Sequence, residues 1–424
     1  MRILIFFALF GISISTGAQY SFETYFTDKV LRVDFLLSGN SQKTLVYLAG
    51  MKEEPFWAGS NTNLIDPYNL GNFKYEVFDE LENKLIYSRG FSSLFQEWQT
   101  TAEAKTTSRS FYEVATMPFP LNKIKFILSI REKSGLFSKL FETSIDPSDY
   151  FIRKENPVNI GITKIYDGGN PNTCVDLAFI AEGYQAEEME KFRNDVKAMA
   201  DFLFAEAPYS TYKEKFNIWA VEAISQDSGT DIPGENYYVN TVLNSSFYTF
   251  NLDRYLTTQD IKTINDYAAA VPHDNIIVLI NSTKYGGGGV YNYYSGTTTG
   301  HQLSPKVFVH EFGHGFAGLA DEYYSSEVAY EEFYPLDVEP WEPNITTMVN
   351  FESKWKMMID KNTPIPTPSE ENYEYTIGLF EGGGYSALGI FRSEMECRMK
   401  SNGPKGFCTV CREAIQKMIE FYIE

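Results

Sequence analysis

The pattern of apolar residues changes once along the chain, at about residues 147–160, and this change limits the fold to a multi-domain one. Before it, short β-type runs separated by turn residues lie at 30–37, 44–49, 75–78, 84–87, 111–114 and 124–130. After it, strand patterns at 174–181, 216–221 and 275–280 alternate with a helical pattern at 186–204. The sequence therefore predicts an all-β sandwich followed by a mixed α/β (α+β) domain.

The expected domain boundaries follow from the same pattern. Residues 1–18 combine Arg2, an apolar run at 3–14 and small side chains at the end, which is typical of a cleavable signal peptide. We expect the sandwich at 19–146, a linker at 147–160 and the second domain at 161–424. No later stretch approaches 18 uninterrupted apolar residues, so the mature chain is expected to be secreted or periplasmic, without a membrane span.

Charge and glycine content exclude two classes of ligand. The 424 residues contain 36 Lys and Arg against 56 Asp and Glu, a formal net charge of −20, and a surface this acidic repels nucleic acid. The four glycines at 286–289 lack the Lys-Ser or Lys-Thr ending of a phosphate-binding loop, which argues against a nucleotide site. This stretch is instead a candidate sheet edge for an extended peptide, with a flexible surface loop as the alternative.

Two of the four histidines lie in the segment His310-Glu-Phe-Gly-His314. A spacing of four places both imidazoles on one face of a helix, one turn apart, where both can bind one Zn²⁺. Glu311 lies beside them and can accept a proton from a water bound to such a metal. The segment therefore predicts a catalytic zinc site with His310 and His314 as ligands and Glu311 as the general base.

A catalytic zinc needs a third protein ligand and keeps one position open. Asp321 is the first candidate, because Gly318 can adopt a positive φ, end the helix and return the chain to the metal. The alternatives are Glu322, the distant acids Glu331 and Glu339, and His301 by a loop return. We therefore expect a site of His310, His314 and Asp321.

Three of the four cysteines, Cys397, Cys408 and Cys411, lie within fifteen residues near the C-terminus. The pair Cys408-Thr-Val-Cys411 could be half of a zinc ribbon, but the sequence has no second Cys pair to complete four ligands. A redox pair would need a thioredoxin-like context, which is absent. We therefore expect a local disulfide from Cys397 to Cys408 or Cys411.

The segment 310–323, His-Glu-Phe-Gly-His-Gly-Phe-Ala-Gly-Leu-Ala-Asp-Glu-Tyr, resembles the active-site signature of the bacterial immunoglobulin A metallopeptidase family, which is metzincin-like. Further similar segments lie at 176–184, 216–219, 378–385, 397–399 and 407–411, and the strand-rich N-terminal part resembles the sandwich that precedes the peptidase domain in many members. The resemblance implies a zincin fold with two His ligands, an acidic third ligand, a Glu base and a methionine turn beneath the metal. Met399, near Cys397, is the first candidate for this turn, and Met348 is its rival.

The chain departs from typical metzincins at two positions. They have Gly three residues and His six residues after the second His of the motif, where this chain has Ala317 and Ala320. This departure from the family pattern shifts the expected third ligand to Asp321.

The expected function is that of a secreted metalloendopeptidase with one catalytic Zn²⁺ and a protein or peptide substrate. Two alternatives stay open: a surface module that binds protein or glycan with a non-catalytic metal site, and a zinc amidase or deacetylase. Glu311 favours catalysis, because a purely structural site does not need a carboxylate beside an open position.

Overall fold

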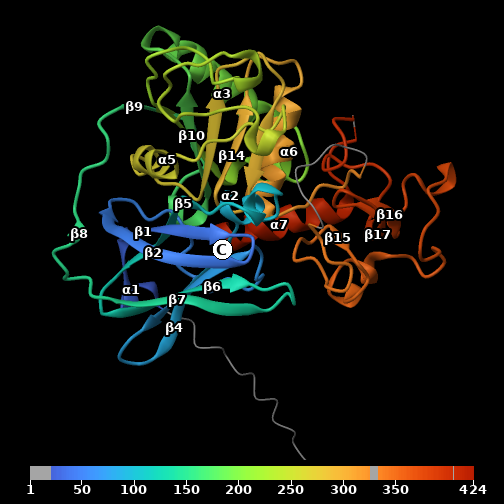
Figure 1. Cartoon of the computed structure of the whole chain (residues 1–424), viewed down its shortest axis with the longest axis horizontal. Helices are drawn as coiled ribbons and strands as arrows, with labels where there is room; N and C mark the ends of the chain where they lie inside the picture. Colours follow the sequence, from blue (N-terminus) through green and yellow to red (C-terminus); the bar gives the residue numbers. More distant parts are fainter. Residues whose placement is uncertain (1–20, 325–332, 404) are drawn as a thin grey trace, which may run out of the picture.

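The computed structural model describes residues 21–324, 333–403 and 405–424. The expected signal peptide at 1–18 and the candidate ligand Glu331 lie outside the described residues. Figure 1 shows the strands of the N-terminal part below the central sheet of the second part, with a small three-stranded sheet at the side. In the part of the chain that the structure describes, no helix is both long and apolar enough to cross a membrane.

The N-terminal part consists of two four-stranded sheets that share one apolar core. Their strand orders are β5-β1-β2-β8 and β4-β3-β6-β7. The strands are β1 (Phe26–Asn40), β2 (Lys43–Glu54), β3 (Phe73–Asp79), β4 (Lys84–Phe91), β5 (Arg109–Pro120), β6 (Ile124–Arg131), β7 (Phe137–Ile145) and β8 (Ile152–Arg153). Along β3, buried residues alternate with partly exposed ones, which is the period of a strand with one face on a core.

Two local features of this part differ from the sequence expectations. Besides the single turn α1 (Phe22–Tyr25), a helix α2 (Leu94–Gln99) follows β4, and its N-cap Ser93 accepts a hydrogen bond from Phe95 N at 3.0 Å. Six residues make less than two helical turns, so the helical period is too short to recognise in the sequence. Within the expected linker, β8 pairs in parallel with β2 and extends the first sheet.

The second part is built on a six-stranded sheet of order β13-β14-β12-β10-β11-β9. Its strands are β9 (Gly161–Tyr166), β10 (Val175–Glu182), β11 (Phe216–Glu222), β12 (Asn275–Ile280), β13 (Gly287–Val290) and β14 (Tyr294–Thr298). The four inner strands are parallel, whereas both edge strands run antiparallel to their neighbours. Every residue of β10 and β12 is buried, as expected for parallel strands covered on both faces.

Helices cover both faces of this sheet. On one face, α3 (Met189–Leu203) and α6 (Ser304–Ala317) share a core with alternate residues of β10, and α5 (Ile261–Ala268) packs on the other face. The C-terminal helix α7 (Thr409–Ile423) lies against α6, and a short helix α4 (Tyr209–Tyr212) precedes β11. The small sheet has the order β15-β17-β16, with β15 (Ile345–Thr346), β16 (Phe380–Gly383) and β17 (Ser386–Arg392).

Polar contacts join the two parts at several points. Buried Arg32 on β1 donates through Nη1 to Asp266 Oδ1 on α5 at 2.8 Å. Asn63 Nδ2 donates to the carbonyl oxygen of Phe421 on α7 at 2.9 Å. Ser92 N donates to the carbonyl oxygen of Tyr291, just after β13, at 2.9 Å. The last contact places the N-terminal domain next to the edge strand β13, which also contacts helix α6.

Candidate active site

Helix α6 carries the motif of two histidines and ends where the sequence predicts. Gly318 has a φ of +62°, and its N–H donates to the carbonyl oxygen of His314 at 3.0 Å. The same turn places the carbonyl oxygen of Leu319 2.5 Å from His314 Nδ1. The helix end is therefore confirmed, and the chain after it turns back along the face that bears the imidazoles.

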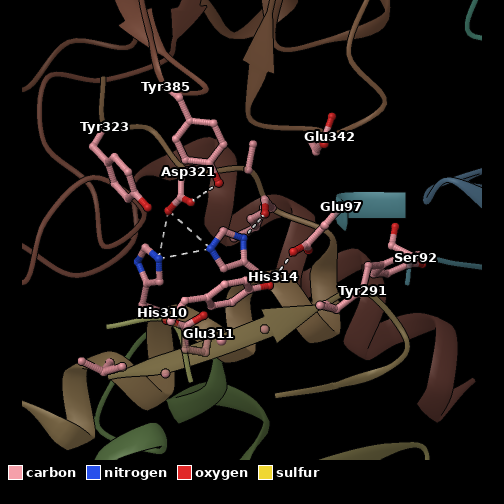
Figure 2. A pocket seen from close by; sticks show the side chains of 18 of the residues that line it. Ser92, Glu97, Tyr291, His310, Glu311, His314, Asp321, Tyr323, Glu342 and Tyr385 are labelled. Carbon is pink, nitrogen blue, oxygen red and sulfur yellow. Dashed lines mark hydrogen bonds and ion pairs between the residues drawn. The ribbon is translucent and has the colours of Figure 1, made fainter. Parts of the chain in front are cut away.

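The side chains of His310, His314 and Asp321 converge on one point (Figure 2). Asp321 Oδ1 lies 3.0 Å from His310 Nε2 and 3.4 Å from His314 Nε2, and the two Nε2 atoms are 3.1 Å apart. Ligands of a tetrahedral zinc at 2.0–2.1 Å from the metal lie about 3.3 Å from each other. The three atoms therefore fit three corners of a zinc site.

Hydrogen bonds orient each of these side chains. His310 Nδ1 lies 2.9 Å from the carbonyl oxygen of Arg398, so each imidazole directs Nδ1 to a backbone carbonyl and Nε2 to the centre. Tyr385 Oη donates to Asp321 Oδ2 at 2.6 Å and leaves Oδ1 facing the histidines. Metal-binding sites commonly use such outer hydrogen bonds to set the tautomer and direction of their ligands.

Charge and burial shift the pKa values of these groups in opposite directions. Burial alone would lower the pKa of His314, but Asp321 outweighs it and raises that pKa to about 9. Burial would likewise raise the pKa of Asp321, yet His314 and His310 hold it well below its usual range. Burial raises the pKa of Glu311 against the opposing effect of His310 and His314. The cluster thus attracts positive charge, which a bound dication supplies in place of a proton.

The glycines at 286–289 lead into and form most of β13, a paired edge strand rather than a flexible surface loop. A Cβ atom at Gly289 would lie 2.2 Å from the carbonyl oxygen of Glu311, and one at Gly287 would lie 3.0 Å from Glu311 Cγ. Only glycine permits this distance, so the strand and helix α6 are in direct backbone contact. β13 therefore runs beside the motif.

A cavity of about 420 Å³ opens over the three converging side chains, and both domains line it. The second domain contributes His310, Glu311, His314, Asp321, Tyr323, Trp341, Tyr385 and β13. The N-terminal domain contributes Asn72, Ser92, Gln96 and Glu97. The sandwich is therefore part of the wall of the cleft.

The rival candidate ligands lie elsewhere. Glu322 is fully buried, and its Oε1 accepts a hydrogen bond from Asn344 Nδ2 at 3.0 Å rather than facing the histidines. Glu339 Oε2 accepts hydrogen bonds from Thr347 and Asn350, and His301 accepts one from the N–H of Leu303. Of the candidates within the described residues, Asp321 alone joins the two histidines.

Met399 lies beneath the motif and Met348 does not. Met399 is fully buried, with Sδ 2.9 Å from where a Cβ of Gly313 would be, and its carbonyl oxygen accepts a hydrogen bond from Glu322 N at 2.8 Å. Met348 is 41% exposed. Met399 is therefore in position for a methionine turn.

The expected disulfide is not formed in the structure, in which all four cysteines are free. Cys397 Sγ and Cys411 Sγ lie 3.7 Å apart, beyond the S–S bond length of about 2.05 Å. The carboxylate of Glu322 lies among the thiols, 3.2 Å from Cys411 Sγ, which the sequence analysis did not anticipate.

Two family models cover most of the chain. Residues 163–376 and 369–419 match the model described as IgA Peptidase M64, and residues 21–142 match the model described as Peptidase M64 N-terminus. The chain belongs to the IgA peptidase M64 family. This confirms the expected family and indicates a metal-dependent peptidase with a separate N-terminal domain. No curated protein matches the chain.

Some side chains that line the cavity over His310, His314 and Asp321 are not predicted from the sequence. Tyr385 belongs to the segment 378–385, which resembles the family, but its residue type alone does not indicate a role at a metal site. Gln96 lies in a domain without His or Cys. The one available signal was the turn Gly-Gly-Gly-Tyr at 382–385, because Gly384 has a φ of +53° and directs Tyr385 toward Asp321.

Proposed function

We propose that this M64 chain is a secreted zinc endopeptidase of the metzincin-like type, with Zn²⁺ held by His310, His314 and Asp321. The observation that carries the proposal is the convergence of three ligand atoms within 3.0–3.4 Å of one another, at the floor of a cleft lined by Glu311. Secretion rests on the apolar run at 3–14 and is tested by sequencing the N-terminus of the exported protein.

Each group of the proposed site has a separate role in peptide hydrolysis. A bound zinc supplies a Lewis acid that polarises the scissile carbonyl and lowers the pKa of a water molecule. Glu311 accepts the proton of the attacking water and delivers it to the leaving amine. Tyr385 holds Asp321 in place through its hydrogen bond. The side chain of Tyr323 lies beside the carboxylate of Asp321 (Figure 2).

An extended peptide fits the edge of the central sheet. Among the described residues, β14 is the one strand paired with β13, and Gly287 at the start of β13 also bonds Arg254 and Leu256 on its other side. β13 lines the cavity beside Glu311. A peptide that adds to such an edge places its main chain along the strand, and its side chains alternate between the strand and the opposite wall. We infer that Gln96 and Trp341 on the walls contact substrate side chains.

Replacement of Glu311 by Gln tests the mechanism. We expect Glu311→Gln to keep one catalytic zinc by elemental analysis and to lose casein hydrolysis by several orders of magnitude. His314→Ala should lose both that zinc and the activity. Full peptidase activity in Glu311→Gln would overturn the role of Glu311. If chelated and zinc-restored wild-type protein left casein intact but bound it, the chain would be a binding module instead.

A further inference from the structure

A second cluster of metal-ligating side chains lies behind the turn that carries Asp321. The Sγ atoms of Cys397, Cys408 and Cys411 and a carboxylate oxygen of Glu322 all lie within 4.8 Å of one another. The exposed fraction of each of these residues is 2% or less. Three thiols and an acid are thus gathered in the interior, where the proposed peptidase chemistry does not use them.

The distances match a tetrahedral site of three sulfurs and one oxygen. With Zn–S near 2.3 Å and Zn–O near 2.0 Å, neighbouring sulfurs lie about 3.8 Å apart, and a sulfur lies about 3.5 Å from the oxygen. Cys397 Sγ is 3.7 Å from Cys411 Sγ. Glu322 Oε1 is 3.2 Å from Cys411 Sγ and 3.8 Å from Cys408 Sγ. These three distances are close to those of a tetrahedral ligand set, and all four atoms lie within 4.8 Å of one another.

Two backbone N–H groups point at sulfur atoms of the cluster, and one of its carboxylate oxygens has no hydrogen-bond partner among the described residues. Cys408 N donates to Cys397 Sγ at 3.2 Å, and Cys411 N donates to Cys408 Sγ at 3.4 Å in the first turn of α7. Such N–H···S bonds, together with the positive end of a helix, stabilise negative sulfur. Glu322 Oε2 is buried without a hydrogen-bond partner in the described structure. A bound cation would satisfy it.

A disulfide accounts for this arrangement less well. It would consume two of the three thiols and leave the third beside a buried carboxylate. A buried carboxylate is costly unless it is paired or coordinates a metal. Asn344 supplies one hydrogen bond to Glu322, and Arg392 nearby contributes positive charge but directs Nη1 to the carbonyl oxygens of Glu381 and Gly382.

We propose that Cys397, Cys408, Cys411 and Glu322 form a second, structural zinc site, distinct from the catalytic one. All four positions are protein ligands, so this site is closed to substrate. Sequence reasoning reached only the Cys-x-x-Cys half, because the other two ligands come from Cys397 and from a glutamate 75 residues before it.

The site links two segments that shape the catalytic centre. Glu322 follows Asp321 directly, and Cys397 precedes Met399 by two residues. Glu322 N also donates to the carbonyl oxygen of Met399 at 2.8 Å. One ion would thus hold together the turn that carries the third catalytic ligand, the methionine beneath the motif and the start of α7.

Elemental analysis of the full chain tests the proposal without any activity measurement. We expect two zinc ions per chain in the wild type, one in His314→Ala, one in Cys408→Ala and none in the double variant. Cys174→Ala, which removes the other buried cysteine, is the matched control and should keep two. In His314→Ala, cobalt substitution should produce a near-ultraviolet thiolate-to-metal absorption band. This measurement tests the second site even if Cys408→Ala does not fold.

Two results would overturn the second site. One is a single zinc per wild-type chain together with none in His314→Ala. The other is a pair of cysteines in the denatured protein that react with an alkylating reagent only after reduction, which identifies a disulfide. The catalytic proposal fails separately, through retained peptidase activity in Glu311→Gln, so the two failures are distinguishable.

Discussion

The phenol of Tyr385 donates a hydrogen bond to Asp321 Oδ2 over 2.6 Å, from the turn between β16 and β17. The same turn binds the backbone of the ligand segment, because Gly384 N donates to the carbonyl oxygen of Asp321 at 2.9 Å and Tyr385 N to that of Tyr323 at 3.1 Å. A small peripheral sheet therefore positions the proposed third ligand.

Replacing Tyr385 by Phe should weaken zinc binding at the catalytic site. The variant keeps the ring and loses the hydrogen bond to Asp321, and losses of this kind lower metal affinity about 10–100-fold. Competition with a chromogenic chelator measures the change. Tyr375→Phe is the control, since Tyr375 is 81% exposed. Equal affinities in both variants would show that Tyr385 does not hold the ligand.

If the proposed ligand set holds, Asp321→Ala should remove the zinc of the catalytic site, because it deletes the anionic ligand and not only a supporting hydrogen bond. The expected fall in affinity exceeds the 10–100-fold typical of outer contacts. Glu339→Ala should leave zinc content unchanged, since Glu339 bonds Thr347 and Asn350 instead. Zinc lost from Glu339→Ala but kept in Asp321→Ala would indicate a thermolysin-like ligand set.

A methyl group at Gly289 should separate β13 from helix α6. The Cβ would lie 2.2 Å from the carbonyl oxygen of Glu311, so Gly289→Ala should lower the free energy of unfolding by about 1–3 kcal/mol. Peptidase activity should fall further, because Glu311 moves with its backbone. Gly296→Ala on β14 is the matched control, since its nearest contact is 3.5 Å away. Denaturant unfolding compares the two, and equal stabilities would contradict the direct contact.

Glu113 on β5 should make the stability of the N-terminal domain depend on pH. Burial raises the pKa of its carboxyl to about 8, although hydrogen bonds from Ser93 and Tyr293 oppose the shift. Because this pKa is raised, the stability it contributes is full below about pH 4.5 and is lost as pH rises through about 8. At about 1.4 kcal/mol per pKa unit, the shift from 4.5 to about 8 corresponds to a loss on the order of 5 kcal/mol.

Glu113→Gln removes this titration. Its melting temperature should therefore rise relative to that of the wild type between pH 5 and pH 9, whereas the exposed Glu187→Gln control should follow the wild type. A difference between Glu113→Gln and wild type that stays constant with pH would show that Glu113 does not titrate in this range.

The sequence predicts well those elements that are determined by residues close together in the chain. The helix pattern around Phe192 and Val196, the apolar strand from Asn275 and the helix end at Gly318 depend on periodicity or on one backbone angle, and each appears in the structure. His310 and His314 belong to the same class, because four residues of helix bring them together.

What the sequence does not predict depends on contacts between distant segments. Tyr385 reaches Asp321 from 64 residues away, and Glu322 lies among cysteines that follow it by 75 to 89 residues. Nothing in a local pattern marks such a partner. The expected disulfide is a case in point, since the cysteine spacing does not reveal the buried carboxylate among the thiols.

The cleft wall supplied by the N-terminal domain has a consequence for how such a protease can diversify. Ser92 and Gln96 lie on a module with no proposed ligand or base, yet they face the cavity. Substitutions there can alter which sequences are cleaved while the reacting groups stay untouched. A recombinant fragment beginning after the linker would lose this surface, and we expect its selectivity to differ from that of the intact chain.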